Sequence, residues 1–213
     1  LNKRSLVEGA DSICDMTGGM GVDLFYMSQG MSRVIYTERQ PLLCEIAKHN
    51  FASLGRDVEV RQGDGVQMPV PDVDVIYLDP ARRATDGSRV YAVEDCEPNV
   101  LDWQEELLKH CKYLIVKLSP MVDITDLLRK MHNVAEVHVV AVKNECKEVL
   151  VKCGTAPTAN ISIHCVDFLA AGNMRYSFTK GEGSVTVANT DTLPYLYEPD
   201  VTLMKSQAFA SIC

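Results

Sequence analysis

The sequence predicts an α/β fold in which helices flank a mostly parallel sheet with one reversed strand. Strand-like apolar runs alternate with helical segments up to about residue 132, an order typical of parallel sheets. A glycine-rich turn joins the first such strand to the first helix. Two further strand-like runs, separated by a short polar turn, close the pattern as a hairpin. A small β-rich segment is expected to follow this sheet.

The first strand, residues 11–15, leads into the turn Asp15-Met-Thr-Gly-Gly-Met-Gly-Val-Asp23. Glycines let a ligand approach the backbone closely, and a helix beginning at Gly21 adds free N–H groups and a positive dipole end. The acids at both ends of the turn can hold cationic or hydroxyl groups. The turn therefore predicts a nucleoside-cofactor site, and its cofactor-binding candidates are Asp15, Thr17, Gly18, Gly19, Gly21 and Asp23.

The second and third strands each end in an acid that extends this site. Residues 33–38 end at Glu38, whose carboxylate can accept both hydroxyls of a ribose, and Arg39 is grouped with it as cofactor-binding. Pro41 suits the first turn of a helix that ends at Gly55. Strand 58–62 then leads into Gly63-Asp64-Gly65. The spacing after Glu38 adds Asp64 and Gly65 to the cofactor-binding candidates.

Apart from Asp74, the fourth strand, residues 73–79, is apolar on both faces until Asp79, as expected of a central parallel strand. Its carboxyl end is where open α/β sheets bind ligands, and a carboxylate on a proline-stiffened turn can hold a nucleophile. Asp79 and Pro80 are therefore the predicted catalytic residues, and Asp79 is also a cofactor-binding candidate. The nearby arginines are the substrate-binding candidates: Arg82, Arg83 and Arg89. The polar stretch around them predicts a loop, a usual place for substrate choice.

The remaining elements complete three predicted parts of the chain. A helix over 100–111, a fifth strand over 112–120, a helix over 124–132 capped by Asp123 and a hairpin of 135–142 with 146–153 follow in order. The first part, residues 1–154, is the predicted catalytic domain. Short strands over 161–168, 174–179 and 184–188 predict a small domain over 155–192. A helix beginning near Asp200 belongs to the third part, residues 193–213.

Composition narrows the function classes. The chain is 46% hydrophobic and 23% charged, which is normal for a globular protein, and no run reaches the length of a membrane helix. None of its eight cysteines forms a Cys-x-x-Cys pair, which predicts reduced thiols in a cytoplasmic protein with no metal site. His132, His138 and His164 are expected to be structural. A net charge of −8 means that any nucleic acid must bind to a local basic patch or to a further domain.

The combined motifs resemble those of class I S-adenosylmethionine (SAM) methyltransferases, which have a Rossmann-like sheet. More particularly, the chain resembles a bacterial family, common in Bacteroidetes, in which a small ferredoxin-like domain and a THUMP-like domain follow the catalytic core. The segments that carry this resemblance are 15–23, 77–83, 116–123, 144–148 and 197–200.

The resemblance implies a cofactor, a domain arrangement and a substrate. SAM would be the cofactor, with Asp64 at the adenine amino group. Residues 155–192 would be the ferredoxin-like domain, and residues 193–213 would begin the THUMP-like domain. Because THUMP domains bind RNA, the resemblance also implies an RNA substrate.

Two departures from related motifs restrict the chemistry. Many methyltransferases of base amines carry Asp-Pro-Pro-aromatic, where the ring stacks on the base, but here Ala81 and Arg82 follow Pro80. RNA uracil-C5 methyltransferases need a cysteine nucleophile just after the fifth strand, where this chain has Lys117-Leu-Ser-Pro120. The leading hypothesis is therefore non-covalent, SAM-dependent methylation, with the methylated atom left open.

Two other function classes are kept beside that hypothesis. An NAD-dependent oxidoreductase would share the glycine turn, although the third glycine of Gly-x-Gly-x-x-Gly is missing after Gly21. A non-catalytic module could retain the cofactor fold without turnover, although the acids at positions 15, 38, 64 and 79 are all intact.

Overall fold

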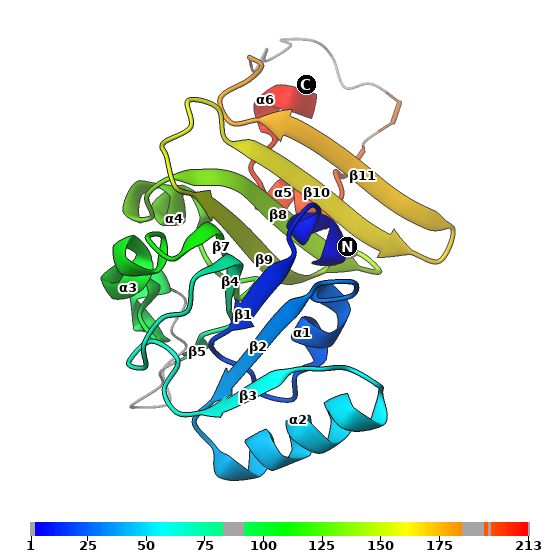
Figure 1. Ribbon diagram of the computed structural model, residues 1–213. Helices are drawn as coiled ribbons and strands as arrows, with labels where there is room; N and C mark the ends of the chain where they lie inside the picture. Colours follow the sequence, from blue (N-terminus) through cyan, green and yellow to red (C-terminus); the bar gives the residue numbers. More distant parts are fainter. Residues whose placement is uncertain (1–2, 83–91, 185–193, 196, 213) are drawn as a thin grey trace.

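A nine-stranded sheet forms the centre of the molecule, in the order β11-β10-β8-β9-β7-β4-β1-β2-β3 (Figure 1). The computed structural model describes residues 3–82, 92–184, 194–195 and 197–212. The strands of the sheet are β1 (Ser12–Asp15), β2 (Arg33–Glu38), β3 (Glu59–Gln62), β4 (Val73–Leu78), β7 (Cys111–Leu118), β8 (Val134–Val142), β9 (Glu145–Gly154), β10 (Ser162–Leu169) and β11 (Gly172–Thr179). A separate two-stranded ribbon pairs β5 (Ala81–Arg82) with β6 (Cys96–Glu97).

The predicted parallel core and its reversed strand are confirmed. Strands β3, β2, β1, β4 and β7 pair in parallel, and β9 is inserted antiparallel between β7 and β8. The hairpin of β8 and β9 turns at Lys143 and Asn144, whose φ angles of 54° and 59° are left-handed, as a tight hairpin turn requires.

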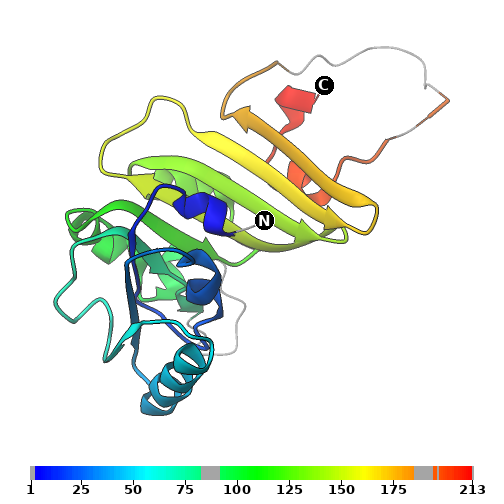
Figure 2. The same ribbon diagram turned by 45° about the vertical axis from the view of Figure 1, so that its right-hand side comes forward.

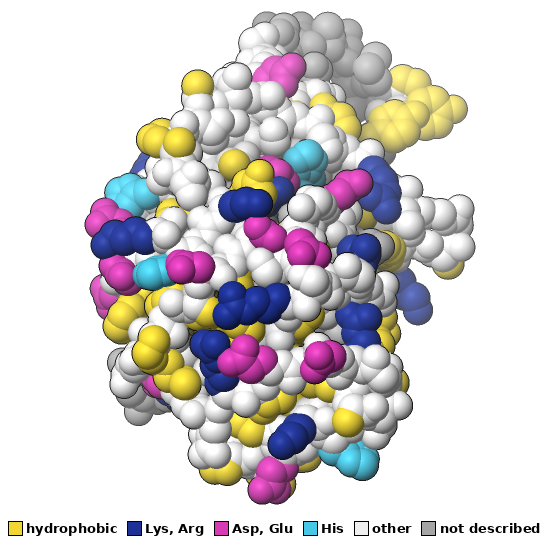
Figure 3. Space-filling model, in the orientation of Figure 1, with side chains coloured by type: hydrophobic (Ala, Val, Ile, Leu, Met, Phe, Trp, Pro, Cys, Tyr) yellow, Lys and Arg dark blue, Asp and Glu magenta, His cyan; other side chains and the backbone are white. Residues whose placement is uncertain are grey.

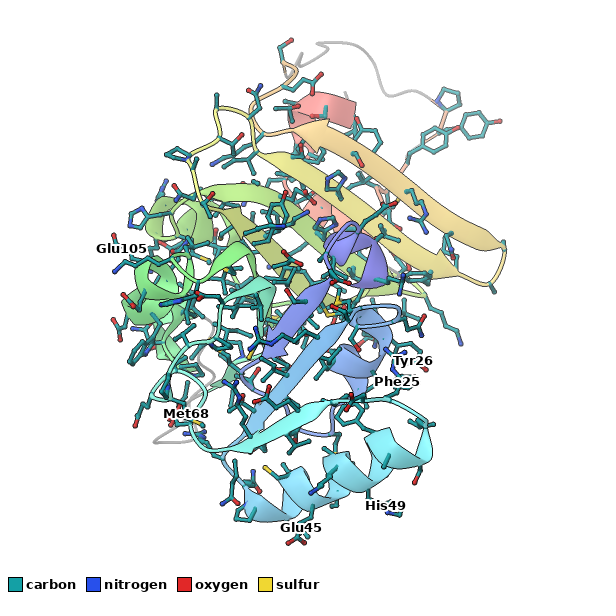
Figure 4. All side chains as sticks on the ribbon, in the orientation of Figure 1. Phe25, Tyr26, Glu45, His49, Met68 and Glu105 are labelled. Atoms are coloured by element: carbon teal, nitrogen blue, oxygen red, sulfur yellow. The ribbon has the colours of Figure 1, made fainter. Side chains whose placement is uncertain are left out.

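Helices cover both faces of the sheet because successive side chains of each strand point to opposite faces. On one face, α1 (Val22–Met27) and α2 (Pro41–Ser53) bury Leu24 and Phe51 against alternate strand residues such as Tyr36. Figure 4 shows Glu45 and His49 pointing away from the sheet on the outer face of α2.

On the other face, α3 (Val100–Leu107) and α4 (Ile124–Lys130) pack on the strands. The remaining short helices are η1 (Lys3–Val7), η2 (Val93–Asp95), α5 (Val201–Lys205) and α6 (Phe209–Ile212). Among the described residues, no helix has the length and apolar character needed to span a membrane.

Two helices begin at aspartates, the predicted cap Asp123 and Asp200, near which a helix was expected to begin. Asp123 accepts a hydrogen bond from the backbone N–H of Asp126 at 3.0 Å, and Asp200 accepts one from Thr202 at 2.8 Å. Helix α3 is shorter than predicted: it ends at Leu107, because Cys111 already pairs with Val73 in the sheet.

The sheet continues past the predicted boundary at residue 154. Strand β10 pairs in parallel with β8, from Ser162 opposite Glu136 to Phe168 opposite Val142, and β11 pairs antiparallel with β10. Two of the three short strands predicted beyond residue 160 are therefore present, at the edge of the large sheet. The third, 184–188, lies almost wholly outside the described residues, and the ferredoxin-like character of 155–192 stays a prediction.

At the hairpin turn, the resemblance segment 144–148 meets Val201, the residue that directly follows the segment 197–200. The side-chain oxygen of Asn144 accepts a hydrogen bond from the N–H of Val201 at 3.0 Å, at the start of α5. The N–H of Asn144 in turn donates to the buried carboxyl of Asp167 on β10 at 2.8 Å. The turn, strand β10 and helix α5 are thereby joined.

Candidate functional site

The glycine turn after β1 is fixed against β2. The N–H of Gly18 donates to the carbonyl of Thr37 at 2.8 Å, and the hydroxyl of Tyr36 donates to the carbonyl of Gly19 at 2.5 Å. A side chain at position 18 would collide with the Tyr36 ring, and Gly21 has a left-handed φ of 72°. The turn thus needs glycine at these positions and presents its backbone at the carboxyl ends of the strands.

Glu38, at the end of β2, holds the turn to the next helix. One oxygen of its carboxylate accepts the N–H of Gly19 at 2.9 Å, and the other accepts the N–H of Gln40 at 2.9 Å. The structure thus brings the predicted acid directly to the predicted glycine turn. Its carboxylate also lines a cavity of about 460 Å³.

This larger cavity runs over the ends of the parallel strands towards the β5–β6 ribbon. Predicted cofactor residues on its wall include Thr17, Gly19, Glu38, Arg39, Asp64, Gly65 and Asp79. Arg39 forms an ion pair with Glu97 at 2.7 Å and lies 4.0 Å from Asp64. A side chain at position 65 would collide with the backbone of Met16, so Gly65 lets the loop after β3 lie against the end of β1.

A smaller cavity of about 200 Å³ lies beside the glycine turn. It shares Thr17, Gly19 and Asp79 with the larger cavity, so the two adjoin at the end of β4. Among the predicted residues it adds Asp15, Gly18, Gly21 and Asp23. The Thr17 hydroxyl accepts the N–H of Asp79 at 2.6 Å, which ties the turn after β1 to the end of β4. Pro80, next in the chain, is buried.

Sequence reasoning missed a group of charged residues around the smaller cavity. Lys117 of β7 forms ion pairs with Asp79 and, at 3.0 Å, with Asp23. Asp23 also accepts a hydrogen bond from the Tyr77 hydroxyl at 2.6 Å and pairs with Lys3 at 2.7 Å. The available signal was a lysine inside an otherwise apolar stretch of the fifth strand, residues 114–118.

Burial and these contacts move the pKa values of the two acids of the turn in opposite directions. Burial raises the pKa of Asp15 to about 7; hydrogen bonds from Thr17 oppose the rise, and the charges of Asp23 and Asp79 add to it. For Asp23, burial also disfavours the charge, but hydrogen bonds from Lys3 and Tyr77 outweigh it and lower the pKa to about 2. The turn therefore carries one carboxyl that titrates near neutrality and one that stays ionised.

Replacing Asp15 with Asn should stabilise the protein above pH 7. A carboxyl whose pKa is raised on folding contributes its full stability below its unfolded pKa and loses that contribution as pH rises to about 7. Asn keeps an oxygen for Thr17 and has no charge to bury. We expect a free energy of unfolding about 1–4 kcal/mol higher than wild type at pH 8.

Urea denaturation at pH 5 and pH 8 would measure this difference. The exposed Asp57→Asn is the matched control and should change stability little at either pH. An Asp15→Asn protein less stable than wild type at pH 8 would contradict the raised pKa.

The substrate candidates are only partly described. Arg82 belongs to β5 and pairs with Cys96 of β6, whereas Arg83 and Arg89 lie outside the described residues. On the face shown in Figure 3, basic and acidic side chains are mixed rather than gathered into one basic patch. The arginines therefore remain predictions as substrate contacts.

The histidines predicted to be structural include two on the sheet, outside both cavities. His138 and His164 stack with ring centroids 4.6 Å apart, and His138 lies 2.8 Å from the carboxylate of Glu136. These three side chains are close enough to share an ion, but Lys152 already pairs with Glu136 at 3.0 Å. None of the cysteines among the described residues forms a disulfide bond.

Comparison with known proteins shows which of them this chain resembles. No family model matches the chain. An uncharacterized SAM-dependent methyltransferase of Mycobacterium tuberculosis is 25% identical over 134 residues, which is 63% of this chain and 36% of that protein. The ribosomal RNA small subunit methyltransferase J of Bdellovibrio bacteriovorus is 33% identical over 84 residues, 35% of this chain and 33% of that protein. The chain thus spans about a third of the length of these relatives.

A solved structure covers nearly the whole chain. It is that of a "putative methyltransferase" from Porphyromonas gingivalis W83, which is 36% identical and superposes with a TM-score of 0.86 over 98% of this chain and 54% of its own. Its agreement includes the edge strands as well as the parallel core. Strand order, glycine turn and relatives together show that the chain has the class I SAM-dependent methyltransferase fold.

Proposed function

We propose that this chain is the methyl-transferring part of a SAM-dependent methyltransferase that acts on RNA. The observation that carries the proposal is that the predicted cofactor-binding residues line two adjoining cavities, which share Thr17, Gly19 and Asp79. These residues include Asp64, Glu38 and the glycine turn. The ribose hydroxyls of SAM would bind Glu38, its adenine would lie towards Asp64, and its methionine end would enter the smaller cavity.

In the proposed chemistry, the main role of the protein is to align the reacting groups. The sulfonium of SAM already activates the methyl group, so the site must hold nucleophile, carbon and sulfur in line. Asp79 ends β4 beside both cavities, and its carboxylate would orient the nucleophile and receive its proton. Pro80 would stiffen that turn, and Arg82, Arg83 and Arg89 would hold phosphate groups of the substrate.

An RNA substrate is supported by two observations. The sequence resembles a family in which a THUMP-like domain follows the core, and one relative is a ribosomal RNA methyltransferase. The net charge of −8 confines any contact with RNA to a local patch or to another part of the protein.

Calorimetry with SAM, with its demethylated product S-adenosylhomocysteine and with NAD would test the cofactor. We expect both SAM and its product to bind without added metal. Tight binding of NAD without SAM would favour the oxidoreductase instead, which the missing third glycine opposes. Cofactor binding without turnover in the full-length protein would favour a non-catalytic module.

Glu38→Ala should weaken SAM binding by about 1–3 kcal/mol, the cost of losing a charge-assisted hydrogen-bond partner. The loss has two sources, because Glu38 would bind the ribose and also holds the N–H groups of Gly19 and Gln40. Glu45→Ala, on the exposed face of α2, is the control and should bind SAM as wild type does (Figure 4). Unchanged SAM affinity in Glu38→Ala together with a collapse in melting temperature would make Glu38 purely structural.

A further inference from the structure

We infer that the methyl acceptor is a hydroxyl oxygen, in RNA a ribose 2′-hydroxyl, and that the Lys117 ammonium is the catalytic cation facing it. The inference rests on the proposed function and specifies which atom of the substrate is methylated. Its basis is the placement of Lys117 and Asp79 together, at the carboxyl ends of the adjacent strands β7 and β4.

The ammonium of Lys117 is held in place rather than free to swing. It pairs with Asp79 on one side and with Asp23, at 3.0 Å, on the other. Asp23 is itself fixed by the Tyr77 hydroxyl at 2.6 Å and by Lys3 at 2.7 Å. Lys3 also pairs with Glu148 of β9 at 3.0 Å, so four separate segments of the chain position this one cation.

Lys117 also keeps its charge in this position. Its side chain is 23% exposed, and burial alone would lower its pKa, but the neighbouring carboxylates of Asp79 and Asp23 outweigh burial and raise it. The ammonium lines the smaller cavity together with Asp79, beside the glycine turn where the methionine end of SAM is placed. The ammonium, held between Asp79 and Asp23, therefore lies beside the proposed place of methyl transfer.

The positive charge of Lys117 favours one kind of methyl-acceptor atom over another. An amine nitrogen gains positive charge as it is methylated, and a nearby ammonium opposes that gain of charge. A hydroxyl oxygen gains negative charge as its proton leaves, and the same ammonium stabilises it, as preorganised donors stabilise oxyanions. The absence of an aromatic residue after Asp79-Pro80 agrees, because no ring is supplied there to stack on a target base.

The step balances without a further reactant. The hydroxyl O–H bond breaks and its proton passes to the Asp79 carboxylate and then to water. The oxygen lone pair forms the new O–CH₃ bond while the C–S bond of SAM breaks, and its electron pair neutralises the sulfonium to a thioether. Lys117 stays protonated throughout and contributes charge alone.

The test uses the full-length protein, SAM with an isotope-labelled methyl group and total RNA from cells that lack the gene. Labelled RNA is digested to nucleosides, and mass spectrometry locates the methyl group. We expect label on ribose oxygen, in nucleosides whose 3′ linkage resists alkaline hydrolysis. Label on a base nitrogen or carbon would overturn the inference and leave the proposed function intact. Failure to label RNA, or failure to bind SAM, would instead remove the proposed function.

Variants of Lys117 test its role separately. Lys117→Met should lower kcat by about 100- to 1,000-fold and leave the Kd for SAM within a few-fold of wild type, whereas Lys117→Arg should recover part of the rate. Lys112→Met, on the same strand but paired with Asp74 at its other end, is the matched control and should keep full activity. A Lys117→Met protein that loses SAM affinity but keeps kcat at saturation would make Lys117 a ligand of the cofactor and overturn the inference.

Discussion

Asp79→Ala should lower the rate of methyl transfer by about 100- to 10,000-fold, the range for loss of a positioned proton acceptor. SAM affinity should change little, because the ribose and adenine are assigned to Glu38 and Asp64 at the other end of the larger cavity. An interaction made mainly in the transition state lowers kcat without much change in binding. Single-turnover kinetics and calorimetry on the full-length protein would measure the two quantities.

The matched control for this variant lies at the opposite end of the same strand. Asp72, just before β4, has a side chain that is 88% exposed and lies far outside the cavity linings. Asp72→Ala should therefore turn over at the wild-type rate. Wild-type rates from Asp79→Ala as well would remove Asp79 from the mechanism and leave alignment as the source of catalysis.

Gly18→Ala should destabilise the fold and abolish most SAM binding. The new methyl group would meet the ring of Tyr36, which is fully buried between the sheet and α2 and also donates to the carbonyl of Gly19. Overpacking of this kind costs about 1–3 kcal/mol, and relief by moving the glycine turn would displace the cofactor-binding backbone. Urea denaturation and calorimetry would measure both losses.

A control variant and a rescuing double variant test whether the collision with Tyr36 causes these losses. Gly154→Ala, where an added methyl group meets only an ordinary contact with Ala156, should change stability little. The double variant Gly18→Ala with Tyr36→Leu should be less destabilised than the sum of the single changes, because the smaller side chain relieves the collision. Simple additivity of the two changes would show that the close approach of Gly18 to Tyr36 does not limit stability.

Local pattern was enough to predict most of the fold around the site. Residues 11–15, 33–38 and 73–79 each have an apolar middle and end in an acid, and these three terminal acids lie at the same edge of the sheet, because strands in parallel end together. The glycine turn, the cap at Asp123, the start of a helix near Asp200 and the reversed hairpin were likewise predicted from signals within a few residues of one another.

Features that depend on contacts between distant segments were missed. The parallel pairing of β10 with β8 is not encoded in either strand, since apolar alternation does not say which neighbour a strand chooses. Lys117 meets Asp79 and Asp23 only because β7 lies next to β4, and Lys3 joins them only because η1 packs against α1. A sequence shows the lysine inside an apolar strand, but the fold supplies its partners.

The strand order also determines when each strand edge can be paired during synthesis. When residues up to Leu118 have emerged, the five parallel strands that carry the glycine turn, Glu38 and Asp79 are all present, but β7 still has an unpaired edge. That edge is covered only by β9, and the far edge of β8 waits for β10, which is made later still. Unpaired strand edges are templates for aggregation. Until β9 and β10 have emerged from the ribosome, the chain would therefore carry the strands of the candidate cofactor site beside an unpaired strand edge.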